Sequence, residues 1–194
     1  MHLQQKKPLA VRTRTCDGCD LCCTVSGVAA LEKPPGIRCR HLTVLAEPGR
    51  NCMIYERRPA DCKSFLCIWR SSDTALSEAF RPADCGFALW VNDPFQWPMV
   101  ITVGVDPARP DAWDQPHYRA RFAEIAWELN CMVAIGQGAL ASHVFAPSGT
   151  VYAKGDYPMF FLANGHVGVP DFDFRPGVRP SIREIASMLM GIPA

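Results

Sequence analysis

The sequence predicts an α+β fold built from two unequal parts, and three observations support this prediction. Cysteines gather in the first third of the chain, where eight of ten lie between Cys16 and Cys67. The remainder alternates short apolar runs with one long amphipathic pattern, which is typical of a small, mostly antiparallel mixed sheet covered by helices. The 194 residues, 48% of them hydrophobic, suffice to bury a core without disulfides. We expect a basic tail (residues 1–15), a cysteine-rich segment (16–70) and an α+β part (71–194), packed as one compact unit.

The cysteine-rich segment, residues 16–70, contains many chain breakers and charges. Pro34-Pro35-Gly36 and Glu47-Pro48-Gly49 interrupt it, and it has few long apolar runs. Because such a segment buries little apolar surface of its own, we expect it to fold poorly without a ligand.

The α+β part, residues 71–194, contains alternating helix and strand patterns. Helices are expected at Asp73–Phe80, Gln115–Cys131 and Ser181–Met190. In the last of these, Ser181 and Glu184 have the spacing of a capping box. Strands are expected at Gly86–Val91, Met99–Val105, Met132–Ile135, Ala141–Ala146, Val151–Lys154 and Met159–Leu162. Turns are expected at Pro147–Gly149 and Asn164–Gly165.

The strongest chemical signal is the run Cys16-Asp-Gly-Cys19-Asp-Leu-Cys22-Cys23. Two cysteines separated by two residues can place their thiolates on one metal ion, and Gly18 suits the turn between them. Cys22 and Cys23 are adjacent, so their side chains point in different directions. One of them can complete a site with Cys16 and Cys19, while the other faces a second site or packs as a small apolar residue.

The candidate metal ligands are eight thiols: Cys16, Cys19, Cys22, Cys23, Cys39, Cys52, Cys62 and Cys67. They would satisfy two tetrahedral zinc sites, or one four-cysteine iron–sulfur cluster with four cysteines left over. His41 could replace one sulfur. Cys85 and Cys131 lie in or beside apolar segments and are expected to be buried core thiols. No catalytic residue emerges from the sequence.

Charge and hydropathy exclude several classes of protein. The start of the chain lacks the apolar run of a secretory signal, and no segment has 18 uninterrupted apolar residues, so we expect a soluble, cytoplasmic protein without membrane association. In a reducing compartment, clustered cysteines indicate a metal or catalysis rather than disulfides. The net charge of +1 argues against a nucleic-acid partner.

The order of motifs resembles the CxxCxxCC (YkgJ-like) cysteine-cluster family. The resemblance covers the run from Cys16 to Cys23, Cys39-Arg-His-Leu, and Cys52-Met-Ile-Tyr55 through Arg58-Pro59 and Cys62 to Cys67. It implies chelation of zinc or iron by these cysteines. Flagellin lysine methylases share such a module, but no methyl-donor site is recognisable in the rest of this chain.

Several polar residues flank the candidate ligands. Arg38, Arg40, Arg57, Arg58 and Lys63 could lower thiol pKa values and donate hydrogen bonds to sulfur, or simply form a solvated face. Tyr55 and Arg58, with Pro59 fixing the backbone, could orient the site from outside. The simpler alternative is that the Tyr55 ring only covers it.

Three functions remain open at this point. The favoured one is a metal-binding protein whose zinc or iron is mainly structural, or is stored and carried. Its expected partners are the metal ion and a protein. The second is an iron–sulfur redox or protein-modifying enzyme. The third is a nucleic-acid-binding zinc module that uses the basic start of the chain.

Overall fold

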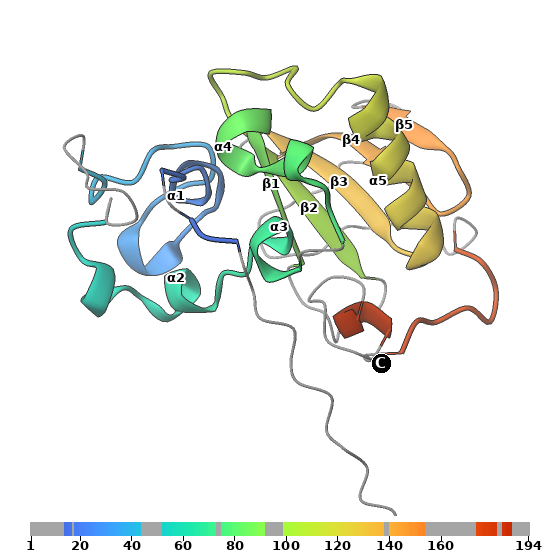
Figure 1. The fold of residues 1–194 in the computed structure, drawn as a ribbon, viewed down its shortest axis with the longest axis horizontal. Coiled ribbons are helices and arrows are strands. Elements are labelled where there is room, and N and C mark those ends of the chain that lie inside the picture. Colours follow the sequence, from blue (N-terminus) through green and yellow to red (C-terminus); the bar gives the residue numbers. More distant parts are fainter. Residues whose placement is uncertain are drawn as a thin grey trace, which may run out of the picture.

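The computed structural model describes residues 14–16, 18–43, 52–72, 75–91, 99–137, 140–153, 174–181 and 184–187. Its centre is a five-stranded sheet of order β1-β2-β3-β4-β5 (Figure 1). The strands are β1 (Phe87–Val91), β2 (Val100–Val105), β3 (Met132–Gln137), β4 (Leu140–Phe145) and β5 (Val151–Ala153). Strands β2 and β3 are parallel and the other neighbouring pairs are antiparallel. The expected mixed, mostly antiparallel sheet is confirmed.

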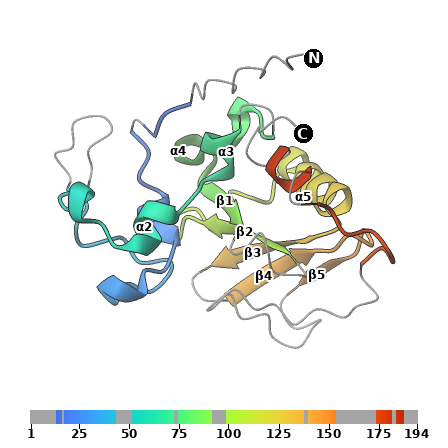
Figure 2. The same cartoon turned by 90° about the horizontal axis from the view of Figure 1, so that it is seen from below.

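The parallel pair arises because helix α5 (Pro116–Glu128) connects β2 to β3. A proline suits the first turn of this helix, where its missing N–H costs nothing. The helix ends where Asn130 adopts a positive φ of 46°, and the Cys131 N–H donates to the Ala126 carbonyl. This crossover lays α5 across one face of the sheet (Figure 2).

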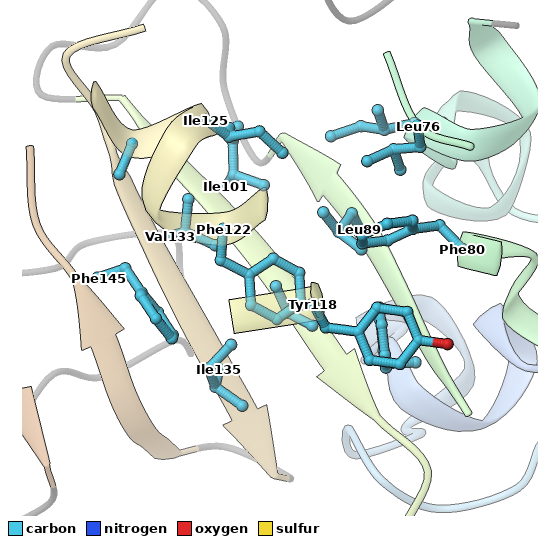
Figure 3. Close-up of a cluster of buried hydrophobic side chains, with 14 of the residues drawn as sticks. Leu76, Phe80, Leu89, Ile101, Tyr118, Phe122, Ile125, Val133, Ile135 and Phe145 are labelled. Carbon is cyan, nitrogen blue, oxygen red and sulfur yellow. The ribbon is translucent and has the colours of Figure 1, made fainter. Parts of the chain in front are cut away.

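Aromatic side chains fill the space between α5 and the sheet. Phe87 of β1 packs edge-on against two rings of α5, those of Tyr118 and Phe122, with ring centroids 4.8 Å and 5.6 Å away. Figure 3 shows the two α5 rings within the cluster. Phe80 and Phe145 extend the cluster on either side. Such tilted pairs add to the stability gained from burial alone.

The helix expected at Asp73–Phe80 is wrong in its described part, since only a single 3₁₀ turn, η3 (Glu78–Phe80), forms there. Two arginine side chains donate hydrogen bonds to backbone carbonyls that would accept from backbone N–H groups in a longer helix. Arg121 donates to the Ala75 carbonyl and Arg14 to the Leu76 carbonyl. A short helix that was not expected, α4 (Pro82–Cys85), follows.

The capping box near the end of the chain is confirmed. The Ser181 N–H donates to the Glu184 carboxylate at 2.6 Å, and the Glu184 N–H donates to the Ser181 hydroxyl at 3.2 Å. Residues 184–187 are helical, and Ile185 packs into the main core. The strand expected at Met159–Leu162 and the turn at Asn164–Gly165 lie outside the described residues.

Short elements make up the cysteine-rich segment. They are α1 (Cys22–Val25), η1 (Ala29–Leu31), η2 (Tyr55–Arg57), α2 (Ala60–Ser64) and α3 (Ile68–Ser71). Both views place α1 and α2 beside β1, at the end of the sheet away from β5 (Figures 1 and 2). Across the described ranges, no helix is long and apolar enough to cross a membrane.

Candidate metal centre

One pocket, with a volume of about 280 Å³, gathers the predicted ligands. All eight line it: Cys16, Cys19, Cys22, Cys23, Cys39, Cys52, Cys62 and Cys67. They come from four separate stretches of the segment and are thiols rather than disulfides. The fold therefore places these cysteines around one space, although the sequence separates them.

The first stretch forms a tight turn that leads into a helix. The Cys19 N–H donates to the Cys16 carbonyl at 2.9 Å, and Gly18 between them has a φ of +71°. This left-handed conformation favours glycine, as expected for the turn. Helix α1 then begins at Cys22, so that the tight turn and the start of this helix together carry four cysteines.

Backbone hydrogen bonds bring the second and third stretches to the first. The Cys39 N–H donates to the Cys23 carbonyl at 3.0 Å. Leu42 forms an isolated β-bridge with Cys52, and the Met53 N–H donates to the His41 carbonyl. His41 itself is half-buried and is not among the residues that line the pocket.

The fourth stretch carries Cys62 in α2 and Cys67 just before α3. Between them, the Phe65 ring packs on Trp90 of β1, with centroids 5.3 Å apart. Cys67 packs against the main hydrophobic core. This stretch therefore connects the pocket to the sheet by packing against β1 and the core.

Strand alternation explains why the pocket lies where it does. Phe87 and Leu89 of β1 face the core beneath α5, whereas Ala88 packs against Leu21 and Val25 of the cysteine-rich segment. Gly104, paired with Ala88, leaves room for that contact. A Cβ there would lie 2.5 Å from the Trp90 ring and 2.9 Å from the Val25 Cβ.

A buried lysine supplies positive charge to the pocket. Lys33 is 9% exposed, and its ammonium donates to the carbonyls of Thr24, Ser26 and Pro34. Burial lowers its pKa, while the negative charge of nearby thiolates, first that of Cys39, opposes this shift. Sequence reasoning missed Lys33, because no motif distinguishes a lysine that precedes two prolines.

Burial favours the protonated form of three pocket thiols, those of Cys19, Cys62 and Cys67. It raises the pKa of Cys19, and it raises that of Cys67 to about 11. Cys23 differs from them, because a hydrogen bond from the Cys22 thiol, helped by the charges of Lys33 and Arg58, lowers its pKa to about 7. The same hydrogen bond raises the pKa of Cys22 well above its ordinary value.

The flanking polar residues have separate roles. The Arg58 guanidinium stacks on the Tyr55 ring at 3.6 Å from its centroid and donates to the Tyr55 carbonyl. Both residues line the pocket, and Tyr55 is half exposed. Arg38 instead pairs with Asp20 at 3.3 Å, and Arg40 donates to the Leu31 carbonyl at 3.1 Å. Cys85 and Cys131 are buried, as expected, and lie outside the pocket.

The chemistry of the donor set fits a thiophilic metal. Eight thiols share one pocket with a buried cation. Among the residues that the structure describes, however, no three side chains of Cys, His, Asp or Glu converge closely enough to hold one ion. A metal would therefore have to draw the sulfurs inward from the positions described here.

The sequence matches no family model, and no curated protein or solved structure matches it. The resemblance to the CxxCxxCC family stays a prediction that rests on the cysteine motifs.

Proposed function

We propose that this chain binds zinc, or alternatively iron, through the thiols of its cysteine-rich segment, and that the metal is mainly structural. The observation that carries this proposal is the gathering of all eight predicted ligands around one pocket. Thiolate sulfur is the ligand that zinc and iron–sulfur clusters favour. The pocket would belong to a module of the CxxCxxCC type packed on the α+β part.

The short helices of the cysteine-rich segment support a structural role for the metal. Helix α1 has four residues and α2 has five, whereas isolated helices shorter than about 12 residues are marginal in water. Structural zinc contributes on the order of 10–16 kcal/mol in small domains at neutral pH. This is comparable with the whole stability of a typical domain.

Charge balance supports the same proposal. Eight thiolates around two divalent ions leave a net negative charge, which is costly to bury alone. Lys33 offsets part of it from inside the pocket, and Arg58 from the rim. Metal binding would also reverse the effect of burial on the thiols, since a coordinated thiol loses its proton.

The proposal is tested by titrating the metal-free full chain with Zn²⁺ in competition with a chromophoric chelator. We expect the chain to take zinc from the chelator. Cys19→Ser and Cys39→Ser should each lower the capacity, while Cys131→Ala, outside the pocket, should keep it. Failure of the natural chain to compete, or equal capacity in all three variants, would contradict the proposal.

Iron uses the same pocket in the alternative form of this proposal. A four-iron cluster on four of the thiols would absorb visible light and show paramagnetic resonance when reduced, whereas zinc is silent in both. The same cysteine variants, reconstituted with iron and sulfide under anaerobic conditions, then identify the cluster ligands.

A further inference from the structure

We propose that the eight cysteines divide into two sets of four, each of which holds its own metal ion. The first set is Cys16, Cys19, Cys22 and Cys67, and the second is Cys23, Cys39, Cys52 and Cys62. This inference rests on the proposed metal binding and goes beyond it, because it states which sulfurs share an ion.

The division begins at helix α1, which opens with Cys22 and Cys23. Successive side chains on a helix leave it about 100° apart, so two adjacent cysteines can turn toward different neighbours although their thiols lie within hydrogen-bond reach of each other. The Cys23 carbonyl accepts a hydrogen bond from the Cys39 N–H, which places Cys23 with Cys39. These two residues therefore form the point at which the sets meet, with one member in each.

Proximity defines the first set. The Cys16–Cys19 turn is closed by the hydrogen bond between their backbones. Cys67 comes close from the other end of the segment: the Arg14 guanidinium, two residues before Cys16, donates to the carbonyl of Trp69, two residues after Cys67, at 2.9 Å. Cys22 begins α1 three residues after Cys19. After burial, the charges of Cys19 and Cys16 also raise the pKa of Cys67, which agrees with this placement.

The second set is defined by backbone pairing and by proximity. Cys39 is hydrogen-bonded to the backbone of Cys23. Cys52 faces Leu42, whose N–H in turn donates to the Cys39 carbonyl at 3.1 Å. Cys62 follows Cys52 through two short helical turns, η2 and α2, and lines the same pocket as Cys23 and Cys39. After burial, its pKa is raised by the charges of Cys23, Cys39 and Cys52, in that order, which agrees with this placement.

The two sets lie in different surroundings. Cys19 and Cys67 of the first set pack against apolar clusters of the sheet and core. The second set lies close to two cations, because the charges of Lys33 and Arg58 both act on Cys23. Four thiolates and one divalent ion carry a charge of about −2, part of which Lys33 and Arg58 offset at the second set.

The test uses the full chain loaded with ¹¹³Cd²⁺, which reports each tetrathiolate site as a separate NMR resonance. We expect two resonances for the natural chain. Cys16→Ser/Cys19→Ser should remove or move one of them, and Cys39→Ser/Cys52→Ser the other. The crossed variant Cys19→Ser/Cys39→Ser should disturb both.

The outcomes distinguish a failure of the division into two sets from a failure of the proposed metal binding. If the natural chain binds cadmium but each double variant disturbs both resonances, or the crossed variant leaves one intact, the division is wrong while metal binding stands. If the natural chain binds no metal, both fail.

A second measurement does not depend on a variant folding or on loading of the metal. The metal-free chain is treated with limiting diamide, which takes two hydrogens from each thiol pair, and the resulting disulfides are mapped by mass spectrometry. We expect Cys67 to join Cys16 or Cys19, and Cys62 to join Cys39 or Cys52. Bonds from Cys67 to Cys39, Cys52 or Cys62 as the main products would overturn the division.

Discussion

Cys23 and Cys67 differ in chemistry, although both thiols line the pocket. With a pKa of about 7, roughly half of Cys23 is thiolate at neutral pH, whereas Cys67, at about 11, is almost wholly protonated. In the metal-free chain, iodoacetamide should therefore modify Cys23 well before Cys67. The rate should rise as pH increases through about 7, as the proton leaves. Peptide mapping over a pH series measures this.

Lys33 and Arg58 provide the control for that prediction. Both cations lower the pKa of Cys23, so Lys33→Met or Arg58→Met should shift the midpoint of its alkylation to higher pH. Glu78→Gln, on an exposed side chain away from the pocket, should leave the midpoint unchanged. A midpoint that stays fixed in both cation variants would show that these charges do not act on Cys23.

Arg14 shows a residue whose role the sequence concealed. It falls in the stretch expected to be a basic tail, yet its side chain is only 8% exposed. Its guanidinium donates to the carbonyls of Trp69, Ser72 and Leu76. Composition reveals positive charge, but it cannot reveal that three distant carbonyls point at one spot.

Replacing Arg14 should therefore be costly. Arg14→Ala leaves three carbonyls without their charged donor, and we expect the free energy of unfolding to fall by about 2–4 kcal/mol. Its ion-pair partner Glu78 is exposed, so Glu78→Ala should cost less than about 1 kcal/mol. Urea denaturation of the two variants measures the difference. Equal costs would mean that the ion pair, and not the carbonyl contacts, is what matters.

At the scale of elements, the sequence predicts the five strands and helix α5 well and the short helices poorly. Helix α5 lies inside its expected range, and β1 and β2 each begin one residue after the expected start and end at the expected residue. Helix α5 buries residues at helical spacing, whereas β2 is a short apolar run that is buried along its whole length. The region around Ala75 and Leu76 was predicted as helix, and arginine side chains from elsewhere override that local preference. The gathering of four cysteine stretches depends on backbone pairing between them, which no single stretch encodes.

The contact between α1 and the sheet offers a test at this scale. Gly104→Ala would place a methyl group 2.5 Å from the far edge of the Trp90 ring, so we expect a loss of about 1–3 kcal/mol in the free energy of unfolding. Trp90→Phe removes the two ring atoms in closest conflict. The double variant should therefore be more stable than the sum of the two single changes predicts. Strict additivity, measured by urea denaturation, would contradict this contact.

For the whole molecule, the two parts differ in what holds them together. The cluster beneath α5 is a hydrophobic core that includes Phe122, Ile101 and Ile135, and in the part of the chain that the structure describes Cys67 is the one pocket cysteine that packs on it. The cysteine-rich segment has short helices and a thiol-lined pocket instead. Metal removal should therefore destabilise the cysteine-rich segment and leave the core of the α+β part folded.

Hydrogen exchange measures that difference. After chelation, amides in residues 18–43 and 52–67 should exchange faster, while those of β2, β3 and α5 stay protected. Returning Zn²⁺ should restore protection, and Cys131→Ala should respond like the natural chain. Unchanged exchange in the cysteine-rich segment would show that metal does not hold it.

The central claim is that the pocket holds metal, and elemental analysis of anaerobically purified protein, read with its visible spectrum, tests it most directly. The account predicts about two zinc ions per chain and no colour, or about four irons with sulfide and a brown chromophore if iron is the natural metal. Protein that carries well below one metal ion per chain, and that takes up none when zinc or iron is supplied, would contradict it.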